Sequence, residues 1–347
     1  MSGVALDRGF ALALIPAALG GAVWASFGLP LAWLMGAAIV TGGLSFAGLA
    51  ITLPRLLYWP SLAIIGAGVG LTITPAVAAE IARWFPMMAI MGFSGVVLAA
   101  FLTPLVARKG DMEPATAFFS LMPGGVIEMA NIGEPHGADR TTIATLHAIR
   151  VALVVGILPL GLYTLFPSEG AQVQPAVLGA LPLGLVLVIA LAGGWVGRQV
   201  KLPACWLLGA LIAVAALAST GAVAGQVPDT LMAAAQVIVG ISLGAKFKRE
   251  HLRKLPRAMA AGGTALLGII IAMALIGIAF SRLVPMDAPT MVLAFSIGGL
   301  AEMVLTARAL ELDMAIVAAF QAIRAILVNS FAGAIWNRLS QHYHSED

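Results

Sequence analysis

The sequence predicts an all-α, polytopic membrane protein, and its composition is the first reason. Of its 347 residues, 61% are hydrophobic and 10% are charged, and the mean hydropathy of +1.01 lies far above that of soluble domains. The second reason is that the apolar residues form unbroken runs about as long as a helix that crosses a bilayer. A transmembrane barrel would instead show segments of about ten residues with alternating polarity.

Six of these runs are clear, and they cover residues 9–29, 30–51, 86–107, 175–197, 203–224 and 259–279. Together they predict a multi-pass protein of the bacterial inner membrane. The chain has one cysteine, Cys205, so a single chain can form neither a disulfide nor a cysteine-based metal site. Its histidines are too few and too scattered to predict another kind of metal site. We therefore expect no metal and no cofactor.

The chain consists of two similar halves, which predicts two membrane repeats at 1–170 and 175–347. Residues of the first half recur 173 positions later, and one inserted residue then changes the offset to 174. The matching pairs include Gly20 and Gly193, Pro30 and Pro203, Trp33 and Trp206, Gly66 and Gly240, Gly124 and Gly298, Glu128 and Glu302, and Arg150 and Arg324. Ordered self-similarity along a whole chain indicates an internal duplication.

The fifth apolar segment of each half contains helix breakers. In the first half, residues 114–137 read PATAFFSLMPGGVIEMANIGEPHG, where Pro123, Gly124 and Gly125 interrupt a helix near its middle. In the second half the two glycines recur, but Ile297 replaces the proline. The sequence therefore predicts the break less strongly in the second half.

The distribution of Lys and Arg indicates whether each fifth segment crosses the membrane or turns back, because basic residues accumulate in cytoplasmic loops. If both segments turn back, 14 basic residues lie on the side of the N-terminus and 3 on the other; if both cross, the division is 6 to 11. We therefore predict two inverted repeats, each with five crossings plus one broken or re-entrant helical hairpin, and a cytoplasmic N-terminus. Inverted repeats with broken helices are typical of secondary transporters.

Gly124 and Gly125, with Gly298 and Gly299 in the second half, form the predicted tips of these hairpins. Non-helical backbone in a membrane has to line a cavity or be buried in protein. The half-helix after each tip directs N–H groups toward an anion, and glycine lets a ligand approach the backbone closely. We interpret the four glycines as substrate-binding. The alternative is that they only allow helices to pack tightly.

Arg150 and Arg324 are the predicted partners of the substrate's charge. Each lies about ten residues into its segment, roughly 15 Å deep, where an arginine is costly and needs an anion. We expect Glu128 and Glu302 to couple transport to a proton or sodium ion, and His147 to relay protons. The alternatives are two structural Arg–Glu ion pairs and a buried, hydrogen-bonded histidine.

Residues 121–151, LMPGGVIEMANIGEPHGADRTTIATLHAIRV, resemble the AbrB family of bacterial membrane proteins. The family carries a Pro-Gly-Gly-x-x-Glu-Met element, then His-Gly-Ala-Asp and an arginine followed by valine, and residues 297–325 resemble its degenerate second copy. The resemblance implies inherited labels as an ammonia monooxygenase or a regulator of gene expression. The sequence offers no plausible copper or iron ligand set, so we expect that the protein is not an enzyme.

These observations predict an ion-coupled secondary transporter of a small organic anion or amino acid. The alternative function is a membrane sensor or accessory protein that influences gene expression. The sequence contains no soluble basic domain to enter a DNA groove, so we expect no nucleic-acid partner. The expected partners are the anion or amino acid, a proton or sodium ion and membrane lipid, and a homodimer is left open.

Overall fold

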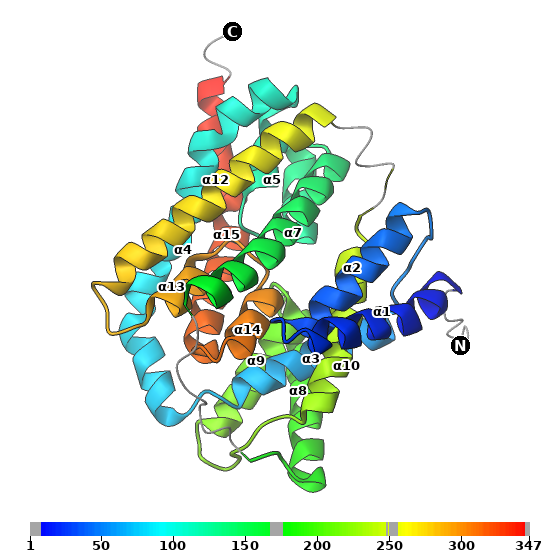
Figure 1. Ribbon diagram of the computed structural model, residues 1–347. Helices are drawn as coiled ribbons and strands as arrows, with labels where there is room; N and C mark the ends of the chain where they lie inside the picture. The colour runs from blue at the N-terminus through cyan, green and yellow to red at the C-terminus, as the bar shows by residue number, and fades with distance from the viewer. Residues whose placement is uncertain (1–7, 167–175, 248, 250–255, 344–347) are drawn as a thin grey trace. The chain divides into compact units, whose positions relative to one another are not determined.

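The computed structural model describes residues 8–166, 176–247, 249 and 256–343. All of the regular elements in these ranges are helices, and one isolated bridge joins Val177 to Gln226. The predicted all-α class is therefore confirmed (Figure 1).

The order of helices in the first half recurs in the second. The first half contains α1 (Arg8–Ser26), α2 (Ala32–Phe46), α3 (Arg55–Gly70), α4 (Pro75–Gly110), α5 (Pro114–Leu121), α6 (Val126–Gly133), the 3-10 turn η1 (Glu134–His136) and α7 (Arg140–Leu165). The second half contains α8 (Ala180–Gln199), α9 (Cys205–Ala218), α10 (Asp229–Gly244), α12 (Pro256–Ser281), α13 (Ala288–Phe295), α14 (Leu300–Ala309) and α15 (Met314–Tyr343). Helices α3 and α10 begin and end 174 positions apart, and so do α5 and α13, while α6 and α14, and α7 and α15, share only their equivalent first residues.

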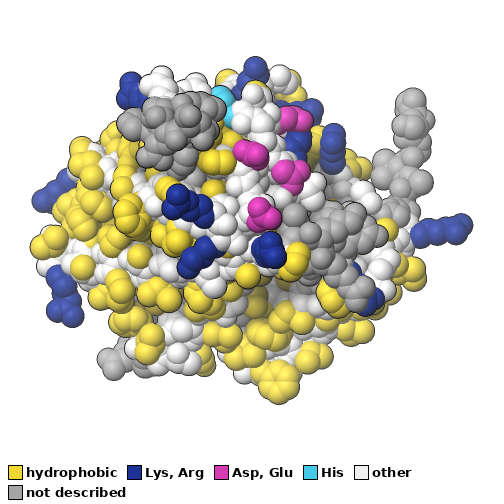
Figure 2. All heavy atoms as spheres, turned by 90° about the horizontal axis from the view of Figure 1, so that it is seen from above, with side chains coloured by type: hydrophobic (Ala, Val, Ile, Leu, Met, Phe, Trp, Pro, Cys, Tyr) yellow, Lys and Arg dark blue, Asp and Glu magenta, His cyan; other side chains and the backbone are white. Residues whose placement is uncertain are grey.

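Six helices in the described part of the chain are long and apolar enough to cross a membrane: α1, α4, α7, α8, α12 and α15. Exposed hydrophobic side chains cover much of the face drawn in Figure 2. The runs at 30–51 and 203–224 form helices of only 15 and 14 residues, so their predicted full crossing length is wrong. Each run opens with a tight turn, at Leu31 (φ 54°) and Ala204 (φ 45°), which delays the start of the helix.

The chain forms two compact units, and each draws on both halves of the sequence. Unit 1 comprises residues 1–79, 159–250 and 304–315, and unit 2 comprises residues 80–158, 251–303 and 316–347. This division differs from the predicted repeats, because a unit combines equivalent helices of the two halves.

Helices in unit 1 approach one another at glycines. A side chain on Gly36 of α2 would meet the backbone of Gly20 in α1, and the equivalent glycines of α8 and α9 have the same relation. Gly66 of α3 abuts the backbone of α9, and Gly240 of α10 abuts that of α2. The glycines of the repeated sequence in this unit therefore bring helices close together, as small residues do in membranes.

Unit 2 contains the first broken segment, which turns back on itself. The backbone N–H of Asp139 donates to the hydroxyl oxygen of Thr116 at 2.9 Å, and the rings of Phe119 and His136 stack with centroids 6.0 Å apart. Residues before and after the break therefore lie side by side, and α5 and α6 form a helical hairpin. A segment that continued in one direction would separate these residues by most of its length.

Candidate functional site

Both fifth segments are broken at equivalent residues, although only the first has a proline there. Helix α5 ends at Leu121 and α13 ends at Phe295, and the next residues, Met122 (ψ 133°) and Ser296 (ψ 146°), are extended. Extended backbone is expected before Pro123, but the second half has no proline at this position. A cause that both halves share must therefore hold the break open.

Besides the paired glycines, both halves share an arginine from the helix that follows each hairpin. Arg150 of α7 donates from Nη1 to the carbonyl oxygen of Met122 at 2.5 Å and from Nη2 to that of Gly124 at 2.9 Å. These carbonyls flank the break and have lost their helical partners. Hydrogen bonds from a charged donor are stronger than neutral ones, so the guanidinium stabilises the non-helical tip.

Arg324 of α15 makes the same bonds in the second half. It donates from Nη1 to the carbonyl of Ser296 and from Nη2 to that of Gly298 at 2.8 Å. It also donates to Oε1 of Gln321 at 2.5 Å, whose own amide donates to the carbonyls of Leu293 and Ser296. The two halves therefore share one hydrogen-bond pattern, which we call the arginine clasp.

His147 is the counterpart of Gln321 and is buried on α7. Its Nε2 lies 3.0 Å from the carbonyl oxygen of Phe119, and the amide of Gln321 lies 2.8 Å from the equivalent oxygen of Leu293. Both side chains thus support the last turn of the helix that precedes the break. The predicted proton relay by His147 stays a prediction.

The structural Arg–Glu ion pairs considered for Arg150 and Arg324 stay an alternative, because the hydrogen-bond partners found for both arginines are backbone carbonyls and Gln321, while Glu302 attracts Arg150. Both side chains are buried, with 3% and 6% exposed, and neither takes part in the ion pairs found among the described residues. Coulombic effects still link the two halves, because Glu302 attracts Arg150 and Arg150 repels Arg324. The Nε–H of each arginine has no hydrogen-bond partner in the described part of the chain.

The glycines and the glutamate of each Gly-Gly-x-x-Glu-Met element pack against each other. A side chain on Gly125 would overlap the carboxylate of Glu128, and Gly299 has the same relation to Glu302. The first glycine of each pair leaves room for the methionine that follows the glutamate. A side chain on Gly124 would lie only 2.7 Å from the side chain of Met129. Each glutamate is partly exposed and lies in the first turn of α6 or α14, where a carboxylate is favoured by the helix dipole.

The two tips converge on one residue that the sequence prediction did not include. A side chain on Gly95 of α4 would lie 3.3 Å from Pro123 and 3.6 Å from Ile297, the equivalent residues of the two tips. Gly92, one turn earlier, faces the backbone of Arg324 at 3.4 Å. The spacing of these glycines on one helix face was the available signal, since small residues mark close packing in membrane helices.

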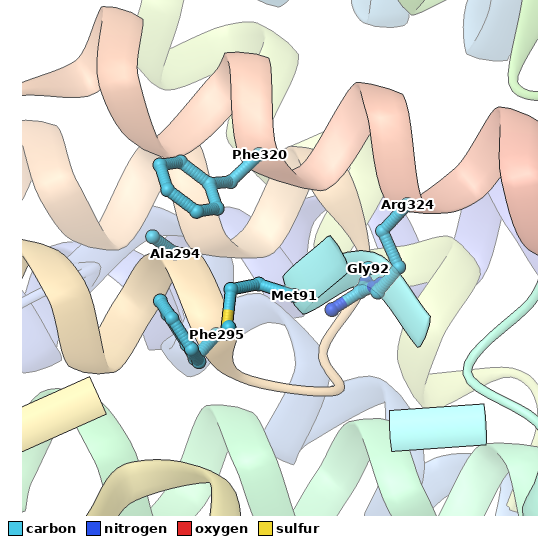
Figure 3. Close-up of a pocket in the computed structure, with 6 residues that line it drawn as sticks. All are labelled: Met91, Gly92, Ala294, Phe295, Phe320 and Arg324. Carbon is cyan, nitrogen blue, oxygen red and sulfur yellow. The ribbon is translucent and has the colours of Figure 1, made fainter. Parts of the chain in front are cut away.

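A cavity of about 10 Å³ lies beside Arg324 (Figure 3), lined by Met91, Gly92, Ala294, Phe295, Phe320 and Arg324. The guanidinium descends from α15 toward Gly92 on α4, while Phe320 and Phe295 lie along the other side. A cavity of this volume has room for about one water molecule. An organic anion does not fit there in this conformation.

The polar end of the first hairpin is held by local interactions. Arg140 forms an exposed ion pair with Glu134 at 2.5 Å and donates to Asn131 at 3.0 Å. Asp139 caps α7 by accepting from the backbone N–H of Thr142 at 2.7 Å. Burial raises the pKa of Asp139, but hydrogen bonds from Thr142 outweigh that effect and lower the pKa below its usual value.

Metal binding finds no support in the described ranges, where no group of three or more His, Cys, Asp and Glu side chains could hold an ion. The described acidic side chains that gather on the face in Figure 2 thus do not make such a cluster.

Comparison with known proteins gives one matching family model and related bacterial chains. A family model described as "Transition state regulatory protein AbrB" matches residues 33–340. A Bacillus subtilis (strain 168) protein named "Uncharacterized protein YhjN" is 28% identical over 282 residues, which cover 76% of this chain and 73% of that protein. An Escherichia coli (strain K12) protein named "Putative regulator AbrB" is 27% identical over 304 residues, which cover 85% of this chain and 86% of that protein.

Proposed function

Because this chain belongs to the AbrB family and has six helices suited to a bilayer, we propose that it is an ion-coupled secondary transporter of the bacterial inner membrane. Its substrate is a small organic anion or an amino acid. The observation that supports this proposal is the arginine clasp, which repeats in both halves at two hairpin tips that converge on Gly95. Secondary transporters bind substrate near such breaks, at the interface of repeats.

The charge balance at the tips favours an anionic substrate. Arg150 and Arg324 carry like charges that repel each other, Glu302 attracts Arg150, and the hydrogen-bond partners found for both arginines are carbonyls and an amide. Buried charges normally need a counter-ion, and each guanidinium has an unused Nε–H. A carboxylate placed between the tips would reduce the repulsion and accept these hydrogen bonds.

Substrate entry requires the tips to separate, because the cavity beside Arg324 holds about one water molecule. The described conformation is then an occluded one. In this proposal the two halves are inverted repeats with the N-terminus in the cytoplasm, and the opening of one hairpin alternates with the opening of the other. Movement of broken segments around a fixed site is a recurring mode of alternating access.

Glu128 and Glu302 are the groups that we assign to ion coupling. Each carboxylate lies over the second glycine of its tip, so a change in its protonation alters the packing of the residues that form the break. The proton or sodium ion would thus be bound within three residues of the proposed substrate position.

The deciding experiment measures uptake of labelled carboxylates and amino acids into liposomes that contain the purified protein, with imposed proton or sodium gradients. We expect saturable uptake that depends on one gradient. Glu128→Gln and Glu302→Gln should abolish coupling, since glutamine keeps the shape but cannot ionise. Glu80→Gln on α4 makes the same change outside the tips and should leave uptake normal. Gradient-dependent uptake that survives in both tip variants would contradict the assignment.

A second candidate function is a membrane sensor or accessory protein that influences gene expression. The name of the Escherichia coli relative is the observation that favours it. A sensor would bind its ligand at the same tips without moving it. Ligand-dependent protection against thermal unfolding without flux under any gradient would favour this function over transport.

A further inference from the structure

An apolar groove runs between α4 and α12 in unit 2, away from the hairpin tips. Its volume is about 220 Å³. The lining comes from residues spaced i, i+3, i+4 and i+7 on each helix, namely Leu102, Leu105, Val106 and Lys109 on α4 and Ala261, Thr264, Ala265 and Gly268 on α12. This spacing selects one face of each helix, so two helix faces form opposite walls.

The same two helices contact each other on both sides of the groove. At one end, a side chain on Gly110 would lie 3.3 Å from Ala258. Beyond the other end, the hydroxyl of Ser94 lies 3.6 Å from the sulfur of Met273. The helices are therefore antiparallel neighbours, and the groove exists because the α12 wall between these contacts carries small side chains.

One end of the groove carries a cation. Lys109 is exposed and takes part in none of the ion pairs found among the described residues. The remaining lining is apolar except for Thr264, whose hydroxyl donates to the carbonyl of Ala260 in its own helix at 2.8 Å. The groove therefore combines a hydrocarbon surface with one positive charge that forms no ion pair within the described part of the chain.

We propose that this groove binds an anionic phospholipid, with one acyl chain between α4 and α12 and the headgroup phosphate at Lys109. Both helices are suited to cross the membrane, so the groove faces lipid wherever it is not covered by protein. From 102 to 109 it extends for about 10 Å, roughly two-thirds of the hydrocarbon depth of one leaflet. Basic residues at the edge of a membrane helix attract anionic headgroups.

The charge at Lys109 is what distinguishes this occupant from a second copy of the chain. A helix from another copy could fill an apolar groove, but the lining has no acidic side chain to balance Lys109, so the charge favours an anionic occupant. A lipid with a net negative headgroup satisfies both surfaces at once. The proposal does not depend on transport, since a sensor would retain the same lipid.

Native mass spectrometry of the detergent-purified protein, titrated with phosphatidylglycerol or phosphatidylcholine, tests the proposal. We expect one phosphatidylglycerol to be retained with higher affinity than phosphatidylcholine. Lys109→Gln should weaken phosphatidylglycerol binding about five-fold, as expected for one basic residue near a membrane surface. Arg108→Gln is the matched control, because it removes the same charge from the adjacent residue, which does not line the groove.

A second variant tests the acyl-chain site without changing the charge. A side chain at Gly268 meets nothing within 4 Å, so Gly268→Leu should fold normally and fill part of the groove. We expect it to reduce binding of phosphatidylglycerol. Equal binding by native protein, Lys109→Gln and Gly268→Leu would overturn the proposal. So would equal affinity for both lipids, or a dimer that Gly268→Leu dissociates while lipid binding is unchanged.

Discussion

The two hairpin regions share one backbone solution but differ in the side chains around it. In both, an arginine ten residues into the following helix donates two hydrogen bonds to the tip. One goes to the carbonyl of the first glycine, and the other goes to the carbonyl two residues before that glycine. The first region has Pro123 and His147 where the second has Ile297 and Gln321. The shared residues stabilise the broken helix, and in the proposed transporter the same residues also bind the substrate and the coupling ion. The residues that differ make the two tips chemically distinct.

The ends of the two regions differ more than their tips. Glu134 of the first region pairs with Arg140. The equivalent residue of the second region is Arg308, which pairs with Asp229 at 2.6 Å in unit 1. Because the equivalent residues carry opposite charges, the two ends form ion pairs with different partners. The two hairpin regions therefore have similar tips but chemically different ends.

The largest effect is expected from removing either arginine clasp. Arg150→Ala and Arg324→Ala each leave two carbonyls at the break without their donors, and each buried unsatisfied group costs about 1–3 kcal/mol. We expect the Tm in detergent to fall by roughly 5–10 °C in both variants. Arg108→Ala on the surface is the control and should change Tm little. An unchanged Tm in either clasp variant would show that the break is held by other contacts.

A smaller effect is expected where glycine and glutamate share space. Gly125→Ala should cost about 1–3 kcal/mol through overpacking against Glu128, and Gly299→Ala should do the same against Glu302. In a Glu128→Ala background most of the cost should disappear, which a double-mutant cycle measures by denaturation. Gly156→Ala in α7 has no neighbour within 4 Å and should be neutral or stabilising. Additive costs in the cycle would contradict direct contact.

The cap of α7 gives a test outside the membrane segments. Asp139→Ala should cost about 1 kcal/mol, because the first turn loses an N-cap. The pKa of Asp139 is lowered in the folded protein, so its contribution is present above its unfolded pKa and is lost as the pH falls through the folded pKa. Denaturation at neutral and at acidic pH should therefore show a smaller difference between the two proteins in acid. A difference independent of pH would assign the effect to packing.

The smallest effect is expected from exchanging the residues that differ at the tips. Pro123→Ile and Ile297→Pro should each change stability by less than about 1 kcal/mol, since the backbone before both positions is already extended. Thermal unfolding with circular dichroism measures both the stability and the helix content. Loss of the break in Pro123→Ile, seen as added helix, would show that proline and arginine act together.

The positions of both helix breaks could be predicted from the spacing of repeated residues in the sequence. The offset of 174 between equivalent residues locates both breaks, and it holds where Ile297 replaces proline, because Arg324 keeps its place ten residues into α15. The weaker prediction for the second break arose from treating proline as the cause.

The partners of the charged residues could not be read from the sequence. A buried arginine needs acceptors, and the expected partner was the repeated Glu128, yet the hydrogen-bond acceptors found for Arg150 are backbone carbonyls, which every residue carries. Composition is equally silent about Gly95, whose importance depends on two segments that reach it from different halves. The short helices α2 and α9 were also missed, because hydropathy measures apolar length and not where a tight turn falls.

During synthesis, the tip of each hairpin is made before the arginine that donates hydrogen bonds to it. The tip carbonyl of Gly124 precedes its donor, Arg150, by 26 residues, and Gly298 precedes Arg324 by the same number. At roughly 5–20 residues per second, each hairpin leaves the ribosome about 1–5 s before the side chain that completes it. Until then its open backbone has to stay in contact with water or with the insertion machinery, since lipid offers no hydrogen bonds. The same interval therefore occurs twice during synthesis, once in each repeat.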